Sequence, residues 1–209
     1  MVWKGYHRFK KKRRSYERMR YPLLFSIALA GLFLAGVLGL VLATPHIAFL
    51  DEVVSTLGNL PGIVPYFIAG GVAFTIGYSL FLRKAFAIVG QDTLRARRLI
   101  LALAVTGVAL VAMPYNKEQL LFRWGHTALG FAAAGLIVLL GLEFDKAEKP
   151  AQKGLAWLRA HTPKALGVGT AGLAAATGVS LVMEAYAMVL SLVWLVLVGV
   201  SASRAKNDA

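Results

Sequence analysis

Six stretches of apolar residues, separated by short polar segments, are the feature that most constrains this fold. A helix needs about 20 apolar residues to cross the hydrocarbon core of a bilayer, because its backbone polar groups must be paired internally. The stretches cover 22–44, about 61–82, about 99–113, about 120–142 and two spans within 165–203. We expect a tight hairpin at Met183–Tyr186, because one helix over 165–203 would reach about 60 Å, twice the hydrocarbon thickness. The sequence therefore predicts an all-α integral membrane protein, a six-transmembrane-helix bundle.

The distribution of basic residues predicts the orientation of these helices. Of the 23 Lys and Arg residues, 21 lie before the first stretch or after the second, fourth and sixth, which leaves Lys117 and Arg123 for the opposite side. Cytoplasmic loops retain Lys and Arg when helices insert, so both termini are expected in the cytoplasm. The expected organisation is a basic juxtamembrane tail (1–21), a transmembrane domain (22–203) and a C-terminal tail (204–209). The expected location is the plasma membrane, as a multi-pass protein.

Composition excludes several other classes of protein. Hydrophobic residues make up 58% of the 209 residues, above the roughly 45–50% of soluble domains. The formal net charge of +13 is typical of nucleic-acid binding, but insertion topology explains this excess, so no nucleic-acid partner is expected. Membrane lipids are the expected partners, with anionic headgroups bound by the tail 1–21.

Residues 154–159 resemble a short interfacial helix anchored by Trp157.

Metal and cofactor sites are not predicted. The chain has no cysteine, which excludes disulfides, thiolate catalysis and iron–sulfur ligation. A transmembrane haem usually needs two histidines at matching depth, yet His7 and His161 are expected in the cytoplasm and His46 in an outer loop. No histidine pattern typical of zinc is present. All seven prolines are expected at or near the edges of the spans, rather than in the mid-span breaks of many transporters.

A few polar residues gather at the expected outer side and form the candidate ligand-binding site. His126 lies one to two turns inside the fourth stretch, and Arg123, three residues earlier, projects from nearly the same helix face. Glu184 is expected at the outer hairpin. With Asp51 and Tyr186, these side chains can form one shallow pocket. The alternative is structural: Arg123 extends to the interface, and His126 bonds to Glu184 or to a carbonyl within the bundle.

Three short motifs in order along the chain resemble those of an uncharacterised prokaryotic membrane family, domain-of-unknown-function family 998. They are Val54-Ser55-Thr56-Leu57-Gly58 followed by Pro61 and Gly70-Gly71, Met113-Pro114 followed by His126, and Glu184 followed by Trp194. The resemblance covers about residues 22–203. It implies a six-helix bundle distantly similar to the Frag/DRAM-type membrane proteins that are linked to lipid handling, and it implies no established activity.

The positions carried over by the resemblance are Gly58, Pro114, His126 and Glu184, with Trp194 as a further structural match. A basic residue often follows the glutamate in this family, whereas Ala185 follows it here. A salt link made by the residue after the glutamate is therefore not expected in this chain, because Ala185 has no charge.

Three functions are compatible with these features. The first is binding or transport of a lipid or small amphipathic ligand near the outer leaflet, with Arg123 and His126 at its polar head and Glu184 orienting them. The second is a scaffold or assembly subunit, in which small-residue faces bind a second copy or another membrane protein. These faces are Ala69, Ala73 and Gly77, and Gly167, Ala171 and Ala175. The third is a membrane-embedded hydrolase or transferase with His126 as general base and Glu184 as its orienting group. The sequence leaves open whether the protein is an enzyme.

Overall fold

The described part of this computed structural model is entirely helical. It comprises residues 64–113, 116, 118–146, 153–178 and 181–207. Within these residues the chain forms the helices α2 (Val64–Ile88), α3 (Leu94–Ala112), α4 (Leu120–Asp145), α5 (Lys153–Thr177) and α6 (Leu181–Asn207). The basic tail 1–21, the first predicted span 22–44, Asp51, Gly58 and Pro114 lie outside the described residues.

Three of these helices are long and apolar enough to cross a membrane. The candidate spans are Phe67–Ile88, Leu120–Asp145 and Val182–Ala205. Only 33–39% of each apolar window is buried inside the molecule, so most of these side chains face outward. Exposed Leu or Val side chains occur on all five described helices, in an amount that a soluble monomer rarely displays. The structure therefore supports the prediction of an all-α membrane protein.

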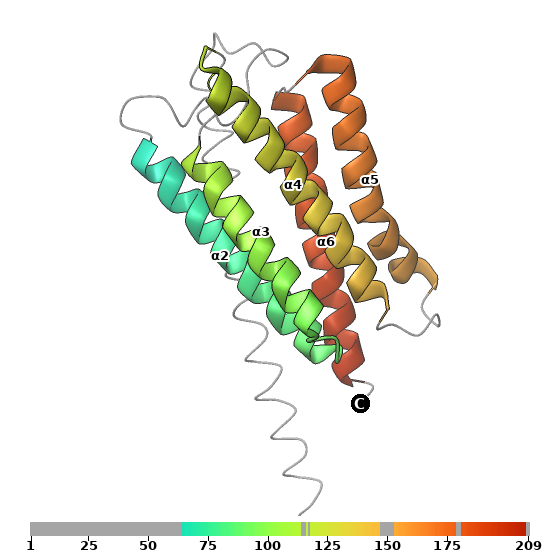
Figure 1. Ribbon diagram of the computed structural model, residues 1–209. Coiled ribbons are helices and arrows are strands. Elements are labelled where there is room, and N and C mark those ends of the chain that lie inside the picture. Colours follow the sequence, from blue (N-terminus) through green and yellow to red (C-terminus); the bar gives the residue numbers. More distant parts are fainter. Residues whose placement is uncertain (1–63, 114–115, 117, 147–152, 179–180, 208–209) are drawn as a thin grey trace, which may run out of the picture.

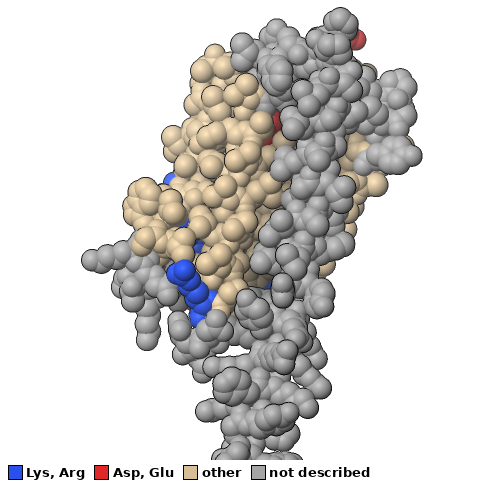
Figure 2. All heavy atoms as spheres, turned by 180° about the vertical axis from the view of Figure 1, so that it is seen from behind, with Lys and Arg blue, Asp and Glu red and all other residues tan. Residues whose placement is uncertain are grey.

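The helices run alternately up and down (Figure 1), so that chain segments far apart in sequence meet at two ends. The lower end gathers the C-termini of α2, α4 and α6 with the N-termini of α3 and α5. The described basic residues near this end are Arg83, Lys84, Arg95, Arg97, Arg98, Lys146, Arg159, Lys164 and Arg204. Arg123 lies near the upper end, in the first turn of α4. Figure 2 shows Lys and Arg side chains clustered low on one face of the molecule.

The hydrophobic core occupies the lower half of the bundle. Consecutive helices pack against each other, and α2 packs against α6 to close the arrangement. Phe86 of α2 meets Phe144 of α4 edge-on, with the ring centroids 5.1 Å apart. Trp194 of α6 is fully buried in the same cluster. This dense packing holds the lower ends of the helices together and leaves the upper half more open.

The hairpin between the last two helices lies earlier than the sequence analysis predicts. Helix α5 continues to Thr177, and α6 already begins at Leu181, so the prediction of a hairpin at Met183–Tyr186 was wrong. Gly178 has φ +70°, a left-handed conformation that commonly ends a helix and that glycine adopts without a steric penalty. Met183 to Tyr186 consequently belong to the first turns of α6.

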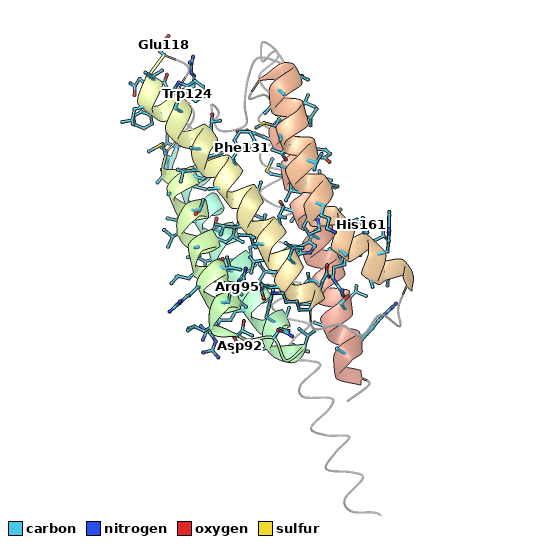
Figure 3. The ribbon with its side chains drawn as sticks, turned by 45° about the vertical axis from the view of Figure 1, so that its right-hand side comes forward. Asp92, Arg95, Glu118, Trp124, Phe131 and His161 are labelled. Carbon is cyan, nitrogen blue, oxygen red and sulfur yellow. The ribbon has the colours of Figure 1, made fainter. Side chains whose placement is uncertain are left out.

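Helix α5 is also longer than predicted. Residues 154–159 are not a separate interfacial helix but the first turns of α5, which begins at Lys153. Pro163 lies inside this helix, contrary to the expectation that all prolines lie near span edges. A proline removes one backbone hydrogen bond and clashes with the preceding turn, so it bends a helix. Figure 3 shows the axis of α5 changing direction near His161.

Candidate ligand-binding cavity

The upper half of the bundle contains a cavity of about 250 Å³ surrounded by all five described helices. Its lining residues lie within Phe67–Ser79 of α2, Leu103–Val111 of α3, His126–Ile137 of α4, Leu166–Thr170 of α5 and Met183–Leu192 of α6. On α4 the lining residues come in adjacent pairs, 126–127, 130–131 and 133–134, followed by Ile137, and this repeat of about one helical turn places them on one helix face. From His126 to Ile137 this face is about 16 Å long at 1.5 Å per residue. The cavity is therefore elongated along the bundle.

Small side chains keep the centre of the bundle open. Gly130, Ala133, Ala134 and Ala187 all line the cavity, at positions where leucine would fill much of the space. Phe131 also lines the cavity and is 39% exposed, so one part of the wall reaches the outer surface of α4. Figure 3 shows Phe131 on the side of α4 that faces α5 and α6.

A histidine and a glutamate form the polar end of the cavity. Nε2 of His126 lies 3.4 Å from Oε1 of Glu184, and the two side chains are only 8% and 16% exposed. Nδ1 of His126 lies 2.7 Å from the carbonyl oxygen of Met113. The ring is thus held between the end of α3 and the first turn of α6. The structure brings together the two residues that the sequence analysis placed at the centre of the site.

Local sequence explains how the Met113 carbonyl becomes available to His126. Met113 precedes Pro114, and a residue before proline is disfavoured in the helical region of backbone conformation. Met113 has φ −116° and ψ 79°, and α3 ends at Ala112. The following residue, Pro114, has no N–H to continue the helix. Because the helix stops here, the carbonyl of Met113 faces α4 instead of accepting a bond from a further helical turn.

Gly125 allows Met113 to pack closely beside the histidine. A Cβ atom at position 125 would lie 2.6 Å from Sδ of Met113, well inside ordinary contact distance. The absence of a side chain at Gly125 therefore lets the end of α3 approach α4 at the level of His126.

The hydrogen bonds determine where the protons on His126 lie. A carbonyl oxygen can only accept a hydrogen bond. Nδ1 of His126 therefore carries a proton and donates a hydrogen bond to the carbonyl oxygen of Met113. The other ring nitrogen, Nε2, faces Oε1 of Glu184.

Other predicted site residues lie away from this pair. The guanidinium carbon of Arg123 lies 5.3 Å from the ring centroid of Trp124, an exposed residue on the outer surface, and Arg123 is not among the cavity-lining residues. The hydroxyl of Tyr186 donates to the carbonyl of Ala165 on α5 at 2.8 Å. The Tyr186 ring packs on Gly169, where a Cβ atom would collide with it. Arg123 and Tyr186 therefore do not line the cavity.

The lower end contains a buried ion pair that the sequence analysis missed. Arg159 of α5 is 3% exposed, and its Nε and one terminal nitrogen donate to the same oxygen of Asp145 at 3.1 and 2.9 Å. Its other terminal nitrogen donates to the hydroxyl of Ser201 at 2.9 Å, and the guanidinium lies over the ring of Phe144. This contact joins α4, α5 and α6. The sequence did contain a signal for this ion pair: Glu143 and Asp145 follow the strongly apolar stretch 120–142, and buried acidic residues need partners.

Three further ion pairs lie at the same end. Glu143, whose side chain is 8% exposed, forms an ion pair with Arg95 of α3 at 2.9 Å and accepts a hydrogen bond from Lys146 at 2.9 Å. Asp92, in the loop between α2 and α3, accepts a hydrogen bond from Arg97, and this bond lowers the pKa of the Asp92 carboxyl. The lower end is thus an electrostatically paired surface, whereas the cavity lies at the other end.

Metal binding has no support in the described residues, which contain no group of three His, Asp or Glu side chains arranged to hold an ion. Comparisons with known proteins gave no match to a family model, to a curated protein or to a solved structure. The resemblance to family 998 therefore stays a prediction.

Proposed function

We propose that this chain is a multi-pass protein of the plasma membrane whose central cavity binds a slim lipid or small amphipathic molecule. In this proposal six helices span the bilayer, both termini are cytoplasmic, and the polar end of the cavity faces the outer leaflet. The grouping of described basic residues at the lower end supports this orientation, because cytoplasmic ends retain Lys and Arg. The tail 1–21 is proposed to contact anionic headgroups.

The observation that carries the proposal is a mostly apolar cavity with an imidazole and a carboxyl group at one end. Carbon-rich side chains such as Phe74, Leu103 and Ile137 form most of its wall, and His126 and Glu184 form its polar end. An amphipathic molecule has the same division along its length. Drug-sized ligands occupy pockets of roughly 300–1,000 Å³. At about 250 Å³, this cavity fits a single acyl chain or a small amphipathic molecule better than a two-chain phospholipid.

Two alanines on α4 provide a matched test. Ala134 is buried and lines the cavity, whereas Ala132 is exposed on the outer surface of the same helix. The variants Ala134→Phe and Ala132→Phe add the same ring to the same helix. We expect native mass spectrometry of the purified protein to show a bound amphipathic molecule in the parent and in Ala132→Phe, and its loss from Ala134→Phe. If both variants retain the same bound molecule, or the parent carries none, the proposal is wrong.

The family assignment is part of the proposal. Met113, His126 and Glu184 are distant in sequence, yet they form one contact cluster. Two of the three motifs that resemble family 998 contribute to this cluster, which supports a shared site. The third motif lies at 54–58 and continues into α2, where Gly71 lines the cavity.

The scaffold hypothesis is the second candidate, and one observation favours it. Ala171 and Ala175 lie one turn apart on α5, and both are exposed. Small residues at this spacing allow close approach of another membrane helix. Cross-linking in native membranes tests this hypothesis: a dimer or hetero-complex lost in Ala171→Leu would support it, and recovery of monomer alone would exclude it.

The enzyme hypothesis ranks third. The 3.4 Å between Nε2 of His126 and Oε1 of Glu184 is only slightly longer than the about 2.6–3.2 Å of a base and its orienting group. However, Nδ1 is oriented by the Met113 carbonyl, and Glu184 faces Nε2, the nitrogen that would have to meet a substrate. This arrangement suits a polar binding end better than a general base.

A further inference from the structure

Two hydroxyl groups in the wall of the cavity are buried without a partner. Ser79 of α2 and Thr170 of α5 both line the cavity, and they are only 7% and 4% exposed. Neither side-chain oxygen has a hydrogen-bond partner within the described part of the chain. Buried polar groups in folded proteins nearly always have a partner, so these two hydroxyls need an explanation.

Other hydroxyls in the same wall are satisfied by their own helices. Thr75 of α2, Thr127 of α4 and Ser191 of α6 also line the cavity, and each donates to the carbonyl oxygen four residues earlier at 2.7–2.8 Å. This bond is a common local solution for a serine or threonine inside a helix. Ser79 and Thr170 do not form it, so their hydroxyls are available to a molecule in the cavity.

Ser79 lies at the lower end of the cavity, far from His126. It is one turn further down α2 than Thr75, which packs against Gly107 of α3. Because α2 and α3 are antiparallel (Figure 1), Ser79 is level with a turn of α3 that lies about ten residues below Met113, the contact of His126. At 1.5 Å per residue, Ser79 is therefore about 15 Å below His126.

Thr170 reaches the same level from a different wall. Gly167 of α5 packs against Val138 of α4, and Thr170 lies about one turn higher on α5. Thr170 is thus level with Gly135 of α4, about 13 Å below His126 at 1.5 Å per residue. Helix α2 packs on α3 and α6, whereas α5 packs on α4 and α6. The two hydroxyls consequently mark a second polar position at the lower end of the cavity.

We infer that the cavity binds an amphipathic molecule with a polar group at each end of its apolar chain. The head lies at His126 and Glu184, and a second hydroxyl or carbonyl group lies within reach of Ser79 and Thr170. A serine or threonine hydroxyl both donates and accepts hydrogen bonds, so the pair suits either group. This inference rests on the proposed function and adds the chemical class of the ligand.

Two pairs of uncharged probes test the inference: decanol with decanediol, and hexanol with hexanediol. Each diol carries a hydroxyl at both ends of its chain. The chain of decanediol is long enough to connect the two polar positions, whereas that of hexanediol is too short. Burying a hydroxyl without a partner is costly, so a purely apolar lower end would favour the single alcohol in both pairs. Because the probes have no charge, no proton has to be assigned to His126 or Glu184.

Binding to the full-length protein in lipid nanodiscs is measured by displacement of the co-purified molecule in native mass spectrometry. We expect decanediol to bind at least as tightly as decanol. In the short pair, hexanediol should bind about tenfold or more weakly than hexanol, because its second hydroxyl stops in the apolar part of the cavity.

Variants assign the second position to the two hydroxyls. The double variant Ser79→Ala/Thr170→Val removes both of them and changes the shape of the wall little. It removes two unpaired buried oxygens, so we expect it to fold. In this variant decanediol should bind about tenfold or more weakly than decanol, while decanol binding is unchanged. Ser191→Ala is the matched control, because it removes a hydroxyl that already donates to Ala187, and it should leave the ratio as in the parent.

The outcomes separate this inference from the proposed function. Weaker binding of decanediol than of decanol to the parent would overturn the inference, while the cavity remains a binding site. Decanediol binding that persists unchanged in the double variant would also overturn it, because another group would then hold the second hydroxyl. The parent alone decides the first point even if the double variant does not fold. If no probe binds and Ala134→Phe behaves like Ala132→Phe, the proposed function itself fails.

Discussion

The carbonyl oxygen of Met113 lies 2.7 Å from Nδ1 of His126, and this contact fixes the histidine ring at the polar end of the cavity. It connects the end of α3 to a buried position on α4. Because the other ring nitrogen faces Glu184, three helices meet at one imidazole. The following predictions test this site, the packing around it and the proposed orientation.

Replacing His126 in two ways should isolate the bond to Met113. The amide of His126→Asn can still donate to the carbonyl from a position close to that of Nδ1, whereas His126→Leu leaves the carbonyl without this donor. Both variants remove Nε2. We expect His126→Leu to be less stable than His126→Asn by about 1–3 kcal/mol, the cost of an unpaired buried polar group. Unfolding of both proteins in detergent micelles measures the difference, and equal stability would show that the bond contributes nothing.

Alanine substitutions at two glycines of α4 should have opposite effects. A Cβ atom at Gly141 would lie 2.7 Å from Cγ of Pro163, in a rigid ring. Gly141→Ala should therefore destabilise the protein by about 1–3 kcal/mol. Gly135 has no neighbour within 4 Å of such an atom, so Gly135→Ala should be neutral or stabilise by up to about 1 kcal/mol through helix propensity. Thermal unfolding of both variants tests the packing of α4 on α5; a neutral Gly141→Ala would contradict it.

Removing one partner of the buried ion pair should cost more than removing both. Arg159 is almost fully buried, so Asp145→Asn leaves its charge without the carboxylate that compensates it. We expect a loss of about 3 kcal/mol, and recovery of more than half of it in the double variant Asp145→Asn/Arg159→Met. A double-mutant cycle in detergent measures the coupling. Additive losses would mean that the pair is not coupled in the folded protein.

The Asp92–Arg97 pair should make the stability of the folded protein depend slightly on pH in the acidic range. The hydrogen bond from Arg97 lowers the pKa of Asp92 in the folded protein. The contribution of this pair to the stability of the folded protein is therefore complete above the ordinary aspartate pKa of about 3.9. It is lost as the pH falls through the lower pKa that Asp92 has in the folded protein. The difference in melting temperature between the parent and Asp92→Asn should shrink over that range. A difference that grows on acidification would contradict the assigned sign.

Single cysteines should report the orientation, because the natural chain contains none. We expect a membrane-impermeant maleimide to label Glu118→Cys in intact cells, and to label Arg98→Cys only after permeabilisation. Both positions are exposed, so access to the label depends on the side of the membrane. The reverse pattern would place the polar end of the cavity in the cytoplasm and would refute the proposed topology.

The positions of the apolar stretches could be predicted from the sequence because they depend on local composition. The predicted stretch at 120–142 corresponds to α4, which begins at Leu120. Helix ends were harder to predict. Helix α5 begins at Lys153, well before the apolar run, because its first turns are held by Arg159 through Asp145 and Ser201 on other helices. Gly178 was the local signal for the hairpin, and an apolar run on both sides of it concealed the break.

The sequence by itself determined the helical class, the apolar spans and the one-sided distribution of basic residues. It also singled out His126 and Glu184, because polar groups within apolar spans are uncommon and need partners. Only the tertiary structure decided that these two side chains meet, while Arg123 turns to Trp124 and Tyr186 turns to α5. Periodicity describes the faces of one helix, whereas a contact or a cavity between helices depends on how all their axes pack together.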